Sequence, residues 1–96
     1  MTSKERSTLM SLASKLDPIL HIGKSSITPE MTGAVLEAFN NNELIKIDVN
    51  KNCFDDLYEL GNTLSERTHS TLVQVIGRKI VLYKPAKNQK DRVIGI

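Results

Sequence analysis

The strongest structural signal in the chain is TLVQVIGRKIVLYKP, residues 71–85. Two runs rich in β-branched residues, 72–76 and 80–83, flank the tripeptide GRK at 77–79, and this pattern is typical of a β-hairpin. The second run, IVLY, has four apolar residues in succession, so a strand formed by it has no polar face. We therefore predict that residues 80–83 lie inside the sheet and not at its edge.

The stretch ELIKIDVN, which begins at Glu43, predicts a strand of a different kind. Ile45, Ile47 and Val49 alternate with a lysine and an aspartate, so apolar and polar side chains point to opposite sides. Strict alternation is typical of a strand with one buried and one solvated face. One face of the sheet is thus expected to meet water along this strand.

The N-terminal segment predicts an amphipathic helix and then a short strand. Apolar residues recur at helical spacing from Leu9 to Leu16, behind Thr2 and Ser3, which are candidate caps. Pro18 should end the helix, because the residue before a proline avoids the helical region. A short apolar run at 19–22 then predicts the first strand.

A second helix is predicted from Thr28 and Pro29, which suit the cap and the first helical position. Its apolar stripe continues to Phe39, and the asparagines at 40–42 suit a helix end, where left-handed backbone is frequent. The loop between the first strand and this helix is Gly-Lys-Ser-Ser. A glycine before a helix lets the backbone turn and expose amide groups, as phosphate-binding loops require.

A third helix is expected to open at Asp55 and Asp56 and to bury a stripe of three leucines. Gly61 within it should weaken the helix by roughly 1 kcal/mol relative to alanine. The element order is then α-β-α-β-α-β-β. Because strand–helix–strand units favour parallel pairing with right-handed crossovers, we predict an α/β two-layer sandwich with a four-stranded mixed sheet, whose second face is partly open.

Composition limits the class of protein. The chain has 96 residues, is 40% hydrophobic and 25% charged, and shows neither a membrane-spanning stretch nor a signal-peptide core. Its single cysteine, Cys53, forms no internal disulfide and is expected to be a half-buried structural thiol in a cytoplasmic protein. Residues 25–70 carry three bases and eight acids, whereas residues 71–96 carry six bases and one acid. The basic ends favour a polyanionic partner or a solvated basic tail.

No catalytic or metal chemistry is indicated. A nucleotide-binding P-loop needs a glycine five positions before Gly23, and that residue is Pro18. The spacing of His21, Cys53 and His69 matches no metal-ligand pattern. We therefore expect no enzyme activity, no metal, no cofactor and no small-molecule substrate.

Taken together, LASKLDPILHIGKSSIT, NNNELIKI and LVQVIGRKIVLYKP resemble the CRM domain family (chloroplast RNA splicing and ribosome maturation), and above all its bacterial stand-alone YhbY-like members. The resemblance covers roughly residues 3–86. It implies a fold like the C-terminal domain of translation initiation factor three, with strand order 1-2-4-3. It also implies RNA binding and, for the bacterial members, association with precursors of the large ribosomal subunit.

The Gly-x-x-Gly loop of the family maps onto residues 23–26, with Ser26 in place of the second glycine. Serine disfavours positive φ. Two alternatives to the family's loop therefore stay open, namely a different turn or a loop with one fewer backbone donor. The scarce aromatic residues sit mostly at positions typical of a core, so we expect recognition of structured RNA through its backbone and shape. The predicted RNA-binding residues are Gly23, Lys24, Ser25, Ser26, Thr28, Lys15, Lys46, Arg78, Lys79, Lys84 and Lys87.

We therefore interpret the chain as a monomeric, non-catalytic RNA-binding domain over residues 1–86, followed by a basic polar tail over residues 87–96. It associates with ribosomal RNA in precursors of the large subunit and has no membrane partner. The alternative is a protein-interaction module that binds a basic ribosomal or assembly protein through its acidic middle segment. Four of the eight acids of that segment, Asp55, Asp56, Glu59 and Glu66, would face this partner.

Overall fold

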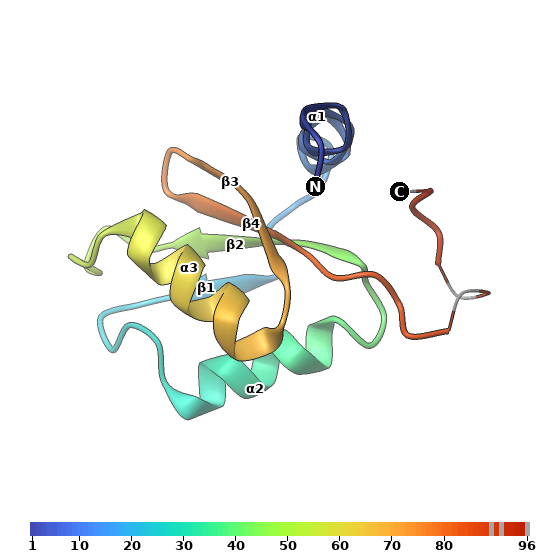
Figure 1. The fold of residues 1–96 in the computed structure, drawn as a ribbon. Coiled ribbons are helices and arrows are strands. Elements are labelled where there is room, and N and C mark those ends of the chain that lie inside the picture. Colours follow the sequence, from blue (N-terminus) through green and yellow to red (C-terminus); the bar gives the residue numbers. More distant parts are fainter. Residues whose placement is uncertain (89, 91, 96) are drawn as a thin grey trace.

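The computed structural model describes residues 1–88, 90 and 92–95. Gln89, Asp91 and Ile96, which belong to the predicted tail, lie outside the described residues. The predicted order of elements is confirmed (Figure 1). The elements are α1 (Ser3–Ala13), β1 (Leu20–Ile22), α2 (Pro29–Ala38), β2 (Leu44–Val49), α3 (Leu57–Thr68), β3 (Thr71–Ile76) and β4 (Lys79–Tyr83).

The four strands form one mixed sheet in the order β1-β2-β4-β3, as the resemblance implied. β1 pairs with β2 in parallel, and β4 pairs antiparallel with both β2 and β3. The hairpin turn places Gly77 at φ 57, a conformation that favours glycine. Ile80, Val81 and Leu82 have no exposed surface. The prediction of a central last strand is therefore confirmed.

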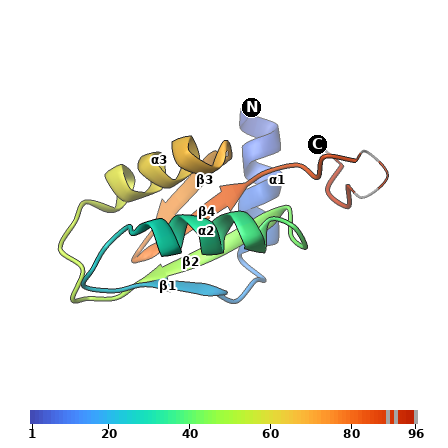
Figure 2. The same cartoon turned by 90° about the horizontal axis from the view of Figure 1, so that it is seen from below.

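Helices α2 and α3 cover one face of the sheet, and α1 lies on the other (Figure 2). The larger core lies under α2 and α3. It contains Ile22, Val35, Ile45, Ile47, Val49, Cys53, Leu60, Leu64, Ile80 and Leu82. Cys53 is 2% exposed, so this thiol is fully rather than half buried. The polar face predicted for β2 is the one that α1 leaves partly open.

Helix α1 contacts the sheet over a shorter length than its sequence pattern indicated. Of the two candidate caps, Thr2 caps the helix, and Glu5 completes a capping box with it. Leu9 and Ala13 are buried against the sheet, but Leu12 and Leu16 are each 38% exposed. The helix ends at Ala13, well before Pro18, and nearer its start Nη1 of Arg6 donates to the carbonyls of Leu72 and Val73 in β3.

The end of α2 differs from the prediction. The asparagines at 40–42 do not adopt left-handed backbone, and Phe39 closes the helix in the right-handed region. Instead, the side-chain amide of Asn42 donates a hydrogen bond to the carbonyl of Ala38 at 3.0 Å. In α3 the left-handed residue at the end is His69, with φ 53.

Packing decides the role of Gly61. A Cβ added there would lie 2.8 Å from Cδ1 of Leu72 and 3.5 Å from Cγ2 of Ile80. An alanine at this position would therefore require the end of the Leu72 side chain to move. The predicted weakening of the helix by Gly61 stays a prediction, because the comparison with alanine in an isolated helix omits this contact.

Candidate nucleic-acid interface

The Gly-Lys-Ser-Ser loop forms a tight turn between β1 and α2. The amide of Ser26 donates to the carbonyl of Gly23 at 3.0 Å, and Ser26 has φ 58. The serine thus adopts the left-handed conformation that favours glycine. Of the alternatives left open by the sequence, a turn that avoids positive φ at Ser26 is not adopted. Lys24 and Ser25 are exposed at the tip, and their amides have no acceptor within the described part of the chain.

The start of α2 offers fewer free donors than the sequence indicated. Thr28 is the cap, and its hydroxyl oxygen accepts from the amide of Met31 at 3.1 Å. Pro29 has no amide hydrogen, and Glu30 places a carboxylate in the first turn. The donors available to an anion are therefore mainly the amides of the turn itself.

The loop after β2 lies beside the Gly23 turn. Because β1 and β2 are parallel, their carboxyl ends meet at the same edge, and the amide of Asn50 donates to the carbonyl of Ile22 at 2.8 Å. Lys51 in this neighbouring loop is exposed. Sequence reasoning missed this lysine, although its position just after β2 would have revealed it once parallel pairing was assumed.

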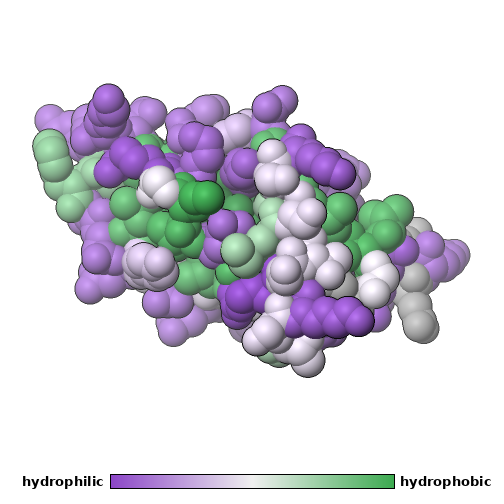
Figure 3. Space-filling model, turned by 90° about the horizontal axis from the view of Figure 1, so that it is seen from above, coloured by the Kyte–Doolittle hydropathy of each residue, from purple (hydrophilic) through white to green (hydrophobic). Residues whose placement is uncertain are grey.

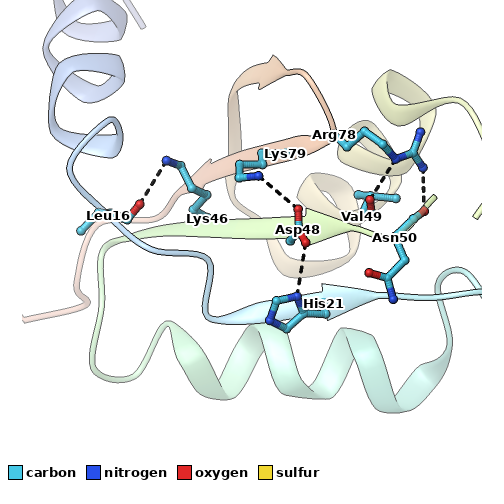
Figure 4. Close-up of polar contacts among 8 residues, drawn as sticks. All are labelled: Leu16, His21, Lys46, Asp48, Val49, Asn50, Arg78 and Lys79. Atoms are coloured by element: carbon cyan, nitrogen blue, oxygen red, sulfur yellow. Dashed lines mark hydrogen bonds and ion pairs between the residues drawn. The ribbon is translucent and has the colours of Figure 1, made fainter.

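Arg78, a predicted RNA contact, fastens the hairpin to this neighbouring loop (Figure 4). Its Nε donates to the carbonyl of Val49 at 2.9 Å, and Nη2 donates to those of Asn50 at 2.7 Å and Cys53 at 2.9 Å. A guanidinium suits such a bridge because its donors form a rigid fork. The Arg78 side chain therefore holds the loop after β2 in place through hydrogen bonds to its backbone.

The open face of the sheet carries a small ionic cluster centred on Asp48 (Figure 4). Lys79 lies 3.3 Å from one carboxylate oxygen, and Nδ1 of His21 lies 3.5 Å from the other. On the same strand, Nζ of Lys46 donates to the carbonyl of Leu16 at 3.1 Å, in the connection that follows α1. Lys46 and Lys79 therefore share this face, and part of their charge is offset by Asp48.

The remaining predicted cations are dispersed. Lys15 is exposed in the connection between α1 and β1. Lys84 and Lys87 follow β4, at the end of the sheet opposite the Gly23 turn, since Tyr83 pairs with Leu44. Nζ of Lys84 donates to the carbonyl of Thr68 at 2.9 Å and so closes the end of α3.

Charge is divided between the two faces of the molecule. Lys46 and Lys79 lie on the α1 side of the sheet, near Leu16 and Asp48 (Figure 4). On this face hydrophobic areas lie among hydrophilic ones (Figure 3). The helix layer on the opposite side is acidic. Its exposed carboxylates, including those of the loop before α3, are Glu30, Glu37, Asp55, Asp56, Glu59 and Glu66.

Two aromatic residues expected at core positions are at the surface. Phe54 is 92% exposed and Tyr58 is 62% exposed. Cys53 occupies the buried position before α3, so Phe54 points outward. In the helix, Leu57, Leu60 and Leu64 face the sheet, which turns Tyr58 to solvent.

A buried carboxylate, which sequence reasoning missed, holds the tail. Glu43 is 5% exposed and accepts from the amides of Ala86 at 3.0 Å, Val93 at 2.6 Å and Ile94 at 3.0 Å. Burial alone would raise the pKa of Glu43, but these hydrogen bonds and Arg92 outweigh it and lower the pKa. No local sequence signal marks this role, because the partners lie more than forty residues away.

The described residues contain no group of three or more histidine, cysteine, aspartate or glutamate side chains placed to hold a metal ion. None of the helices in the described part of the chain is long and apolar enough to cross a membrane.

Known proteins resemble this chain over nearly its whole length. The model of the CRS1/YhbY (CRM) domain matches residues 1–84. A Bacillus subtilis (strain 168) protein named "Probable RNA-binding protein YqeI" is 39% identical over 91 residues, covering 95% of each chain. An "RNA-binding protein" of Haemophilus influenzae is 29% identical, covering 94% of this chain and 91% of its own. The solution structure of a hypothetical protein from Staphylococcus aureus superposes with a TM-score of 0.80 at 47% identity, covering 96% of each chain.

Proposed function

The chain belongs to the CRS1/YhbY (CRM) domain family, and we propose that it is a non-catalytic RNA-binding protein that associates with ribosomal RNA in precursors of the large ribosomal subunit. The observation that carries the proposal is the turn at 23–26, where Lys24 and Ser25 are exposed at the tip and their amides have no acceptor within the described part of the chain. The names of the relatives support RNA as the ligand. The ribosomal step extends beyond those names and rests on the resemblance to the bacterial YhbY-like proteins.

In this proposal, phosphate oxygens accept hydrogen bonds from the amides of Lys24 and Ser25, while Lys24 and Lys51 supply charge. The RNA continues along the α1 side of the sheet, past Lys79 and Lys46. The acidic helix layer would repel it from the opposite side. Such binding follows backbone and shape, and the protein acts as a cytoplasmic monomer.

Replacing Lys24 with glutamate tests the turn. We expect weaker binding to a structured ribosomal RNA fragment, and a plot of log affinity against log salt whose slope is smaller by about one. Fluorescence anisotropy at several salt concentrations measures both. Lys90→Glu changes the charge equally in the exposed tail and should leave binding near the native level. If both variants lost the same RNA affinity, the effect would come from net charge alone, and the role of the turn would be contradicted.

Sedimentation of cell lysate tests the ribosomal step. The native protein should migrate with immature large subunits, and Lys24→Glu should move to the free fraction. If the protein binds the RNA fragment but stays at the top of the gradient, the RNA-binding proposal stands and the assembly role is refuted.

A second candidate function has specific support. The four carboxylates predicted to face a basic partner, Asp55, Asp56, Glu59 and Glu66, are all exposed, as a surface for a basic protein requires. A partner that remains bound after nuclease treatment would favour this function. The two functions use different faces and are compatible.

A further inference from the structure

The start of α3 carries an unusual exposed cluster, which we call the aromatic–acidic patch. It consists of Phe54, Asp55, Tyr58 and Glu59. Phe54 and Tyr58 are 92% and 62% exposed, whereas the neighbouring Leu57 and Leu60 pack in the core. Large aromatic side chains at the surface are enriched in protein interfaces, where they supply contact area at low entropic cost.

The fold holds this patch in place mainly through contacts of its backbone; of its side chains, Asp55 accepts a long hydrogen bond from Sγ of Cys53 at 4.0 Å. Arg78 ties the backbone of Asn50 and Cys53 to the hairpin, and Cys53 is buried. Asp56 caps α3 by accepting from the amides of Tyr58 and Glu59 at 2.9 and 3.1 Å. Phe54 is thus presented on backbone that is fixed on both sides, which lowers the ordering cost of binding.

Charge indicates the partner. Within the described residues, Asp55 and Glu59 form no ion pair, so their charge is open to an outside cation. A phosphate backbone would be repelled here, whereas an arginine or lysine can pair with the carboxylates and lie against an aromatic face. The patch lies on the helix side, away from α1 (Figure 1), so a partner bound there leaves the open face of the sheet free.

We propose that the aromatic–acidic patch binds an arginine- or lysine-rich segment of a partner protein while the Gly23 turn and the α1 side of the sheet bind RNA. This inference rests on the second candidate function and specifies its site and chemistry. It is independent of the Gly23 turn.

The test uses the full chain and a short arginine–glycine peptide as probe. The sequence has no tryptophan, so Phe54→Trp places a single indole reporter in the patch. We expect the indole emission to change as the peptide is added. In the otherwise native chain, Phe54→Ala should weaken peptide binding about two- to fivefold without altering the net charge. Asp55→Asn together with Glu59→Gln should weaken it further.

The control is Glu37→Gln, which removes one exposed acid from α2 on the same helix layer. It is compared with the single variant Glu59→Gln in the patch. If both variants weaken peptide binding equally, and Phe54→Ala has no effect, the attraction is a general effect of negative charge and the proposal is overturned.

A second control titrates an RNA fragment in parallel. If RNA changes the indole emission of the Phe54→Trp variant, and Phe54→Ala weakens RNA binding instead of peptide binding, the patch stacks bases and the proposal is likewise overturned. A loss of RNA binding in Lys24→Glu, with peptide binding intact, separates this site from the proposed RNA site.

Discussion

At the scale of single residues, the candidate interface depends on a serine in a conformation that serine rarely adopts. Ser26 has φ 58 and closes the turn with its own amide. Left-handed backbone costs roughly 1–2 kcal/mol for a residue with a Cβ atom. The surrounding fold must supply this cost, because Ile22 and Ile27 on either side are packed in the core.

Replacing Ser26 with glycine should therefore stabilise the protein. Relief of the left-handed strain exceeds the extra entropy of glycine in the unfolded chain, and we expect a gain of about 0.5–1 kcal/mol in the free energy of unfolding. Urea denaturation measures it. Ser25 has no positive φ, so Ser25→Gly should lower stability instead. A loss of stability in both variants would show that the left-handed turn is absent in solution.

At the scale of elements, the helix layer is fitted to the sheet by a glycine. Gly61 permits α3 to approach Leu72 and Ile80, whereas a Cβ at Gly33 in α2 would meet nothing within 4 Å. The same residue type therefore has opposite roles in the two helices. Intrinsic propensity describes the exposed glycine, and packing describes the buried one.

Gly61→Ala should destabilise the protein by about 1–3 kcal/mol, because the added methyl group overpacks the contact with Leu72. Gly33→Ala is the matched control and should stabilise by about 0.5–1 kcal/mol, since its surroundings are open. Thermal and urea unfolding of the two variants check both signs. A stabilising Gly61→Ala would mean that α3 sits farther from the sheet than described.

At the scale of the whole molecule, the chain closes on itself through Glu43. This carboxylate, just before β2, accepts hydrogen bonds from three backbone amides of the segment after β4. Ile94 of that segment packs against a second, smaller core under α1, which includes Leu9 and Tyr83. The segment predicted as a basic polar tail is thus held against the domain through Val93 and Ile94. The basic charge of this segment is carried by Lys87, Lys90 and Arg92.

Glu43→Gln should lower the free energy of unfolding by about 1–3 kcal/mol at neutral pH, since three amides lose a charged acceptor. The folded pKa of Glu43 lies below its ordinary value, so its contribution is present above that value and is lost as pH falls through the folded pKa. The native protein and the variant should converge in stability in acid. Urea denaturation at neutral pH and at about pH 3 measures this. An equal difference at both pH values would contradict the ionic role of Glu43.

Much of the fold could be predicted from local patterns, because strand alternation, helix caps and the hairpin turn are properties of neighbouring residues. Thr2, Thr28 and Asp56 all cap the helices that follow them. The candidate site was less accessible to this reasoning. Arg78 and Lys84 could be recognised as cations, but not as donors to backbone carbonyls far away in the chain.

Short-range periodicity and turn chemistry were enough to establish the order of the elements, the central place of β4 and the exposed turn at Gly23. The placement of several charged and aromatic side chains required the folded chain, because it depends on contacts between distant segments. Glu43 is buried and Phe54 is exposed because long-range packing assigns the interior positions, and the one before α3 is filled by Cys53.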